Sequence, residues 1–223
     1  CVTLAISDIP GDDLSVIASG PTEPDETTLT NAQAILSKYR IDGPKSIIDS
    51  LASSNAETPK SDNPIFKNVH SHLIATPQQS LEAAAAVAKE NGFNPIILGD
   101  AIEGEAREVA RVLAGITKQV IRHNQPVQKP CVLLSGGETT VTVNGNGRGG
   151  RNVEFLRSLA IELNGLDGVW AFAGDTDGID GTEDNAGALI TPDTLKRAGE
   201  IGLDAKLMLA DNNGYTFFTQ LND

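Results

Sequence analysis

One stretch of the sequence, residues 134–152, places two glycine-rich turns and two arginines around a short strand-like run. Glycine lets a backbone bend sharply and approach a ligand closely. A helix start offers free N–H groups and a partial positive charge, and arginine adds a planar, permanently charged fork that suits phosphate or carboxylate. Because Arg148 and Arg151 stand where the second turn opens a helix, we expect a site for a phosphorylated ligand there. A flexible hairpin tip with solvated arginines is the alternative.

The second turn matches two phosphate-binding motifs incompletely. Its glycines fit G-x-G-x-x-G between a strand and a helix, but the acidic residue that should follow about 20 positions later is only loosely met by Asp167. Residues 145–152 also have P-loop spacing, yet Arg151 and Asn152 replace the Lys and the Ser/Thr that contact phosphate and magnesium. Both motifs bind an anion at the start of a helix, and we predict an anion site of that kind here.

An acidic cluster follows a later strand-like run: residues 174–184 contain five acidic side chains and no basic one. Such a cluster repels itself unless a positive group neutralises it. It is not an EF-hand, because Ile179 and Asp180 occupy the positions that need an oxygen ligand and a glycine. Magnesium held by one or two carboxylates and by substrate phosphate oxygens fits the cluster, and Glu138 either joins such a site or caps a neighbouring backbone. A solvated acidic loop fits equally well.

Polar turns at residues 7–13 and 18–25 could present hydroxyl and N–H groups to a small polar substrate. Tight structural turns explain the same residues, and the chemistry alone favours that interpretation. The turn 211–215 either lies near a site or caps a helix. The three histidines match no catalytic triad and G-x-S-x-G is absent, so a serine hydrolase is not expected.

The elements that must position these residues alternate between strand and helix patterns. Alternation of this kind predicts an α/β fold with a mainly parallel or mixed sheet and helices on both faces. In such sheets ligands bind beyond the carboxyl ends of the strands, where the glycine-rich and acidic turns lie. Residues 54–68 are expected to form a linker. The expected strands are 2–6, 73–75, 95–99, 132–134, 139–143 and 169–173. The expected helices are 27–40, 44–53, one from 77 to near 92, 103–120 and 152–163, with two more beginning at about 191 and 204.

Composition narrows the class of protein. The net charge of −13 argues against general affinity for nucleic acid or an anionic membrane. The two cysteines give no disulfide framework or metal-ligand spacing, and neither a transmembrane run nor a signal peptide is visible, so the expected compartment is the cytoplasm. Because the chain begins without Met in a strand-like run and stops just after a helical pattern, we expect it to be a piece of a longer protein.

Taken together, the motifs resemble the glycerate 2-kinase family, many of whose members are also labelled hydroxypyruvate reductase. Residues 7–13 and 17–22 resemble the end of the family's N-terminal domain, and its C-terminal MOFRL domain is resembled by residues 134–138, 147–152, 175–181 and 210–215. The resemblance covers essentially the whole chain. It implies two α/β domains with the active site in the cleft between them: residues 1–68 as the tail of the first domain plus linker, and 69–223 as most of the second, with the MOFRL region at about 131–223.

The resemblance also implies transfer of the ATP γ-phosphoryl group to D-glycerate, giving 2-phosphoglycerate, with Mg²⁺ required. Arg151, supported by Arg148, would stabilise charge on the transferring group, which is the usual mode of phosphoryl transfer. Asp175 and Asp177 would hold magnesium or orient the glycerate hydroxyl. The implied nucleotide pocket comprises Ser135, Gly136, Gly137, Glu138, Gly147, Gly149, Gly150 and Asn152, and the implied substrate site comprises Asp8, Ser19, Gly20, Thr22, Asp180 and Asn212.

The chain also departs from the family. Members are about twice as long, and the lysine-bearing, glycine-rich segment of their N-terminal half is absent here. We therefore expect the 223-residue chain to need that missing half as a partner and to be nearly inactive alone, and a homodimer is compatible with the sequence. Two other functions stay open: an NAD(P)H-dependent hydroxypyruvate reductase, and a non-catalytic ligand-binding domain of the same fold.

Overall fold

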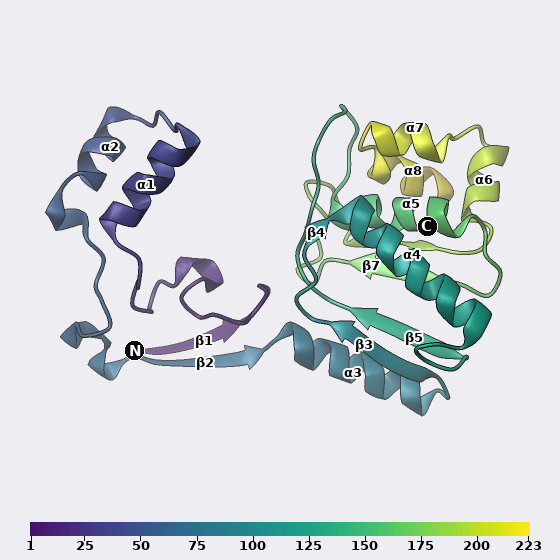
Figure 1. Ribbon diagram of the computed structural model, residues 1–223, viewed down its shortest axis with the longest axis horizontal. Helices are drawn as coiled ribbons and strands as arrows, with labels where there is room; N and C mark the ends of the chain where they lie inside the picture. Colours follow the sequence, from purple (N-terminus) through teal and green to yellow (C-terminus); the bar gives the residue numbers. More distant parts are fainter. The chain divides into compact units, whose positions relative to one another are not determined.

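The computed structural model describes residues 1–223, except for the side chain of Ser54. The chain divides into two compact units, Cys1–Ser80 and Leu81–Asp223, and each is described by itself. Figure 1 gives the element labels. None of the helices that the structure describes combines the length and the apolar content that crossing a membrane requires.

The first unit is built on two parallel strands, β1 (Val2–Ile6) and β2 (His70–Ala75). Between them the chain forms helices α1 (Leu29–Tyr39) and α2 (Lys45–Leu51) and short 3₁₀ turns. The segment expected as a linker is hydrogen-bonded within this unit, because Asp25 N–H donates to the carbonyl of Pro59 and Lys60 Nζ donates to that of Thr27. The domain limits implied by the resemblance stay a prediction.

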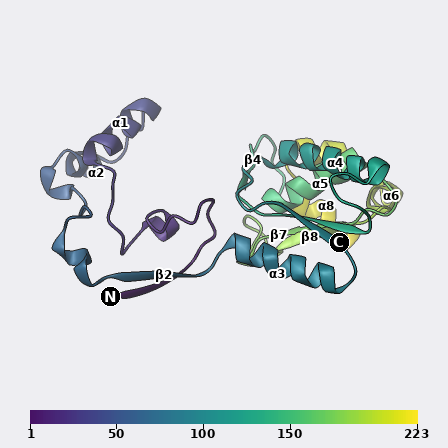
Figure 2. The same ribbon diagram turned by 60° about the horizontal axis from the view of Figure 1, so that its bottom comes forward.

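The second unit has a mixed α/β architecture, as the sequence predicts. Parallel strands β3 (Asn94–Gly99) and β5 (Cys131–Ser135) lie with helix α3 (Pro77–Glu90) on one side and helices α4 (Ala106–His123) and α5 (Arg151–Leu163) on the other (Figures 1 and 2). A second, short parallel pair joins β4 (Gly104–Glu105) to β6 (Thr139–Thr140). Strands β7 (Ala171–Gly174) and β8 (Gly187–Ile190) are antiparallel, and the sequence did not predict β8.

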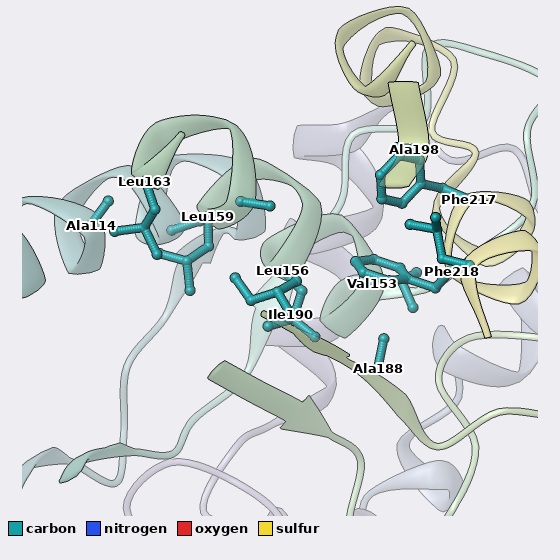
Figure 3. Packing of buried hydrophobic residues seen from close by; sticks show 13 residues of the cluster. Ala114, Val153, Leu156, Leu159, Leu163, Ala188, Ile190, Ala198, Phe217 and Phe218 are labelled. Carbon is teal, nitrogen blue, oxygen red and sulfur yellow. The ribbon is translucent and has the colours of Figure 1, made fainter. Parts of the chain in front are cut away.

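The core of the second unit lies between α5, the β7–β8 pair and the C-terminal helices, which are α6 (Thr194–Glu200), α7 (Ala205–Ala210) and α8 (Gly214–Leu221). Figure 3 shows its side chains, with Leu156 of α5 against Ile190 of β8 and with Phe217 and Phe218 of α8. The two phenylalanine rings meet edge to face, 5.1 Å apart. This core anchors the start of α5, where the arginine-bearing turn ends.

Candidate functional site

The glycine–arginine loop, defined here as residues 144–150, lies against the turn 211–214 that precedes α8. The N–H groups of Asn144 and Gly145 donate to Asn212 Oδ1 at 2.8 and 3.1 Å. The next three backbone N–H groups continue the pattern: that of residue 146 donates to the side chain of Asp211, that of 147 to its carbonyl, and that of 148 to Asn213 Oδ1. Successive backbone donors from 144 to 148 are therefore occupied by the protein itself.

The close approach of the two segments explains the glycines. A Cβ on Gly145 or Gly147 would collide with the backbone of Asp211, and one on Gly150 would collide with Asp180. The sequence predicted that these glycines let a ligand approach the backbone. In the structure, they let one loop of the chain approach another. Contact of Gly147, Gly149 and Gly150, which line a cavity, with a nucleotide stays a prediction.

The start of α5 already holds an anion, which is the carboxylate of Asp180. The N–H groups of Asn152 and Val153 donate to the two oxygens of Asp180 at 3.0 and 2.9 Å, and the side chain of Asn152 donates to it as well. Asp180 is fully buried. A helix start attracts negative charge, and here the chain itself supplies that charge; a phosphorylated ligand near this helix start stays a prediction. This arrangement gives Asp180 a helix-capping role, and the substrate contact that the resemblance implied for it stays a prediction.

Both arginines of the loop region are paired with carboxylates. Arg151 donates from Nε and Nη2 to the two oxygens of Asp175, at 3.2 and 2.6 Å, and its Nη1 contacts Glu138. Asn152 Nδ2 donates to Asp175 as well, at 3.1 Å. A bidentate pair of this kind fixes the plane of the guanidinium, so Asp175 orients Arg151.

Arg148 is held differently, at the surface. It forms a bidentate pair with Glu183, and its guanidinium lies over the ring of Tyr215, 4.9 Å from the centroid. The hydrogen bonds that Arg148 donates to Glu183 raise the pKa of Arg148 above its ordinary value. Tyr215 donates its hydroxyl to Asp184 at 2.6 Å, and that bond raises the pKa of Tyr215. The cluster fixes Arg148 at the outer side of the loop.

A cavity of about 420 Å³ brings several predicted residues together. Its polar wall includes Arg151, Asp175 and Asp177, and its apolar wall includes Val141 and Val143. Within the described part of the chain, no group of three or more His, Cys, Asp or Glu side chains is arranged to hold a metal ion. The described residues therefore form no metal cage of their own, but Asp177 fits Mg²⁺ that takes its remaining ligands from phosphate and water. Both oxygens of Asp175 accept from Arg151, and the role of Asp175 as a metal ligand stays a prediction.

Other predicted residues lie elsewhere. Gly136 donates its N–H to the carbonyl of Gly99 at 2.8 Å, and a Cβ on Gly137 would collide with Ile102. These two glycines pack the end of β5 against the turn 99–102, while Ser135 is exposed. Their contact with a nucleotide stays a prediction.

The predicted substrate residues of the first unit lie at or near its own turn. Ser19 and Gly20 line a cavity of about 550 Å³ in that unit, and both have left-handed backbone angles, with φ of 64° and 58°. Thr22 shares a 2.9 Å hydrogen bond with Thr3 of β1, and Asp8 is exposed. Their roles toward substrate stay predictions.

Three charged residues of the region were missed from sequence: Arg107, Glu154 and Arg157. Glu154 lines the cavity, yet only 2% of it is exposed, and Arg157 is fully buried. One signal was present, because Glu154 and Arg157 stand three positions apart among the apolar residues of α5. Charges at that spacing lie on one face of a helix, and here that face is buried.

Two family models match the chain. The model of the MOFRL family matches residues 131–223, and that of a domain of unknown function, DUF4147, matches residues 1–52.

Curated relatives are similar to nearly the whole chain. A protein of Agrobacterium vitis named "Putative hydroxypyruvate reductase" is 52% identical over 100% of this chain and 50% of its own length. The D-glycerate 2-kinase of Thermotoga maritima is 42% identical over 96% of this chain and 50% of its own length. The glycerate 2-kinase of Pyrococcus horikoshii is 39% identical over 96% of this chain and 49% of its own length. The chain thus spans about half the length of these relatives.

Solved structures show the same likeness. The crystal structure of glycerate kinase from Thermotoga maritima matches with a TM-score of 0.83 at 41% identity, covering 99% of this chain and 52% of that one. The PH0495 protein from Pyrococcus horikoshii matches with a TM-score of 0.75 at 36% identity, covering 99% and 51%. These matches confirm the α/β fold class and the resemblance predicted from sequence: the chain is similar to about half of a glycerate kinase, and its residues 131–223 match the model of the MOFRL family.

Proposed function

We propose that the protein is a glycerate 2-kinase, which transfers the γ-phosphoryl group of ATP to D-glycerate and gives 2-phosphoglycerate. The observation that carries the proposal is the guanidinium fork of Arg151 at the wall of the cavity, oriented by Asp175, in a chain similar to glycerate kinases along its length. A planar fork matches phosphate oxygens. Phosphoryl transfer depends mainly on positioning and on stabilisation of charge, which is what such a fork supplies.

The two carboxylates on Arg151 differ in exposure, and this difference assigns their roles. The side chain of Asp175 is 13% exposed and that of Glu138 is 43% exposed. The more exposed carboxylate is the easier one to displace, so a phosphoryl oxygen would replace Glu138 on Nη1 while Asp175 keeps the fork oriented. Bound Mg²⁺ would neutralise charge on the phosphate oxygens. We assign the protein side of that ion to Asp177, which lines the same cavity and accepts a hydrogen bond from the N–H of Ile179.

The names of the Agrobacterium vitis relatives favour a second candidate, an NAD(P)H-dependent hydroxypyruvate reductase. A G-x-G-x-x-G fingerprint binds pyrophosphate through backbone N–H groups of its loop and helix start. Here the N–H groups of 144–148 donate to residues 211–213, and those of Asn152 and Val153 donate to Asp180. This arrangement supports the kinase over the reductase.

The test offers the full-length protein glycerate with Mg-ATP and, separately, hydroxypyruvate with NADH or NADPH. We expect 2-phosphoglycerate to form and no nicotinamide to be oxidised. Oxidation of the nicotinamide without any 2-phosphoglycerate would overturn the kinase proposal. Omission of Mg²⁺ should abolish turnover, which tests the metal separately.

Arg151→Ala should lower kcat of that kinase about 10³-fold, because an arginine that stabilises the transferring phosphoryl group is worth at least that much. Arg122→Ala is the matched control: Arg122 lies exposed near the end of α4, away from the cavity residues, and its loss should leave kcat unchanged. Unchanged activity of Arg151→Ala would show that the fork is not the phosphoryl site and would favour a non-catalytic ligand-binding domain.

A further inference from the structure

A buried network of charged side chains lies behind the cavity wall. Glu154 of α5 accepts hydrogen bonds at one oxygen from Arg107 Nη2 and from Asn212 Nδ2, the latter at 3.3 Å. Its other oxygen accepts from Arg157 Nη2 at 2.9 Å. Burial lowers the pKa of Arg157 to about 10, and neither Nε nor Nη1 of Arg157 has a hydrogen-bond partner among the described residues. Glu154 is thus the carboxylate that joins α4, α5 and the 211–214 turn.

Asn212 connects this network to the glycine–arginine loop. Its side chain is buried, and each end of its amide is used. Oδ1 accepts from the N–H groups of Asn144 and Gly145, while Nδ2 donates to the carbonyl of Thr142 at 3.3 Å and to Glu154. A buried amide that is satisfied on both sides defines one geometry. The side chain of Asn212 therefore links the loop to Glu154 of α5.

The segment that leads into the loop is held by the same network. Glu105, just before α4, accepts from the N–H of Thr142 at 3.0 Å and from its hydroxyl at 3.0 Å. Glu105 lies 3.8 Å from Nε of Arg107, which in turn contacts Glu154. The pair of Glu154 with Arg157 is buried, and breaking a buried ion pair on one side is costly because it leaves an uncompensated charge. The network is consequently a rigid frame for the loop.

We propose that Asn212 and Glu154 are positioning residues, which hold the glycine–arginine loop, with Arg148 in it, against the start of α5, where Arg151 lies. Asn212 then acts on the loop and not on the substrate, where the resemblance had placed it. Glu154 follows Arg151 by three residues on α5 and lines the same cavity. The buried network and the guanidinium of Arg151 therefore lie within one turn of the same helix. The consequence for catalysis rests on the proposed kinase function, but the consequence for the loop does not.

Amide hydrogen exchange tests the loop directly, in the full-length protein without ligand. In the wild type, the amides of 144–148 should exchange slowly, because each donates to residues 211–213. Exchange as fast as that of a solvated turn would overturn the proposal before any variant is made. Asn212→Ala should speed exchange at 144 and 145 by about tenfold or more, while the buried residues of α5 stay protected.

The matched control is Asn144→Ala in the same loop. Its side chain is exposed, and the mutation keeps the backbone N–H that Asn212 accepts, so exchange should stay slow. Equal exchange at 144 and 145 in folded Asn212→Ala and in wild type would overturn the proposal. Where Asn212→Ala fails to fold, Glu154→Gln serves as the second variant: it keeps the size of the side chain, removes the charge facing two arginines, and should also loosen 144–148.

Kinetics supply the second readout. A loop that presents arginines to the transferring group matters most in the transition state, so Asn212→Ala should lower kcat more than it raises KM for ATP. A substrate-binding Asn212 would instead raise KM for glycerate with the loop still protected, and that result would overturn the proposal. A wild type that lacks kinase activity would refute the proposed function, while the exchange data would still decide the role of Asn212.

Discussion

Helices α1 and α5 carry similar apolar patterns, but the two units use them differently. Helix α5 buries Leu156, Leu159 and Leu163 in the core of the second unit, whereas α1, all of whose side chains the structure describes, has no buried residue. Ile35 of α1 is 52% exposed. The same helical periodicity therefore accompanies full burial in one unit and little burial in the other. Periodicity shows which face of a helix is apolar, and the partner elements decide whether that face is covered.

The turns of the two units also differ in which contacts hold them. In the first unit, the turn before Thr22 is held by neighbours: Ser15 bonds the side chain of Asp13, and the N–H groups of Ser19 and Gly20 donate to carbonyls three residues earlier. In the second unit, the glycine–arginine loop is held by residues 64 to 68 positions away, the shortest of these separations being from 147 to 211. Local contacts organise the first turn, and long-range contacts organise the second.

The largest stability difference should come from the helices. Leu156→Ala empties a fully buried position of α5 and should lower the free energy of unfolding by about 2–5 kcal/mol, from lost transfer energy and a new cavity. Ile35→Ala on α1 should change it by less than about 0.5 kcal/mol, because exposed substitutions rarely exceed that. Urea unfolding followed by circular dichroism measures both. Equal losses would mean that α1 is covered in solution.

A smaller difference should separate two helix starts. Asp180 caps α5 from another segment and is buried, whereas Thr28 caps α1 from the adjacent position, with Asn31 N–H donating to its hydroxyl. Asp180→Ala should cost about 2 kcal/mol, because it leaves backbone donors unpaired inside the protein. Thr28→Ala should cost about 1 kcal/mol or less, since water can replace an exposed cap. Thermal unfolding of each variant checks the order, and a reversed order would contradict the comparison.

The distinction between local and long-range contacts also decides which features could be predicted from the sequence. The helix expected at 152–163 is α5, and the helix expected to begin at about 204 is α7, which Asp204 caps. The helix expected from 77 is α3, and Thr76 with Gln79 forms a capping box at its start. Each of these rests on residues within one helical turn. The cap of α5 by Asp180 lies 28 positions away, and a single sequence carries no sign of that pairing.

Strand lengths and the candidate site also depend on long-range contacts, which the sequence does not reveal. The strand expected at 139–143 ends at Thr140, because the N–H of Thr142 donates to Glu105 and the following donors turn to 211–213. The glycine spacing predicted that the N–H groups of the loop bind an anion. In the structure those N–H groups donate to residues 211–213, a pairing that the spacing alone does not reveal. Arg151 and the nearby acids could be selected as candidates from their chemistry, whereas the pairing of Arg151 with Glu138 required the fold.

The smallest effect concerns a single carboxylate of the first unit and tests how local its turn is. The hydroxyl of Ser15, and then its N–H, lower the pKa of Asp13 below the ordinary value, which is about 3.9 for aspartate. The resulting stabilisation is present above the ordinary pKa and is lost as the pH falls through the lowered one.

Ser15→Ala removes the hydroxyl and keeps the N–H, so the pKa of Asp13 should move back toward the ordinary value without reaching it. Carboxyl chemical shifts recorded by NMR between pH 2 and about 6, the range in which aspartate titrates, measure both pKa values. An identical pKa in wild type and Ser15→Ala would show that more distant groups set the charge of Asp13, and the turn of the first unit would then resemble the long-range loop of the second.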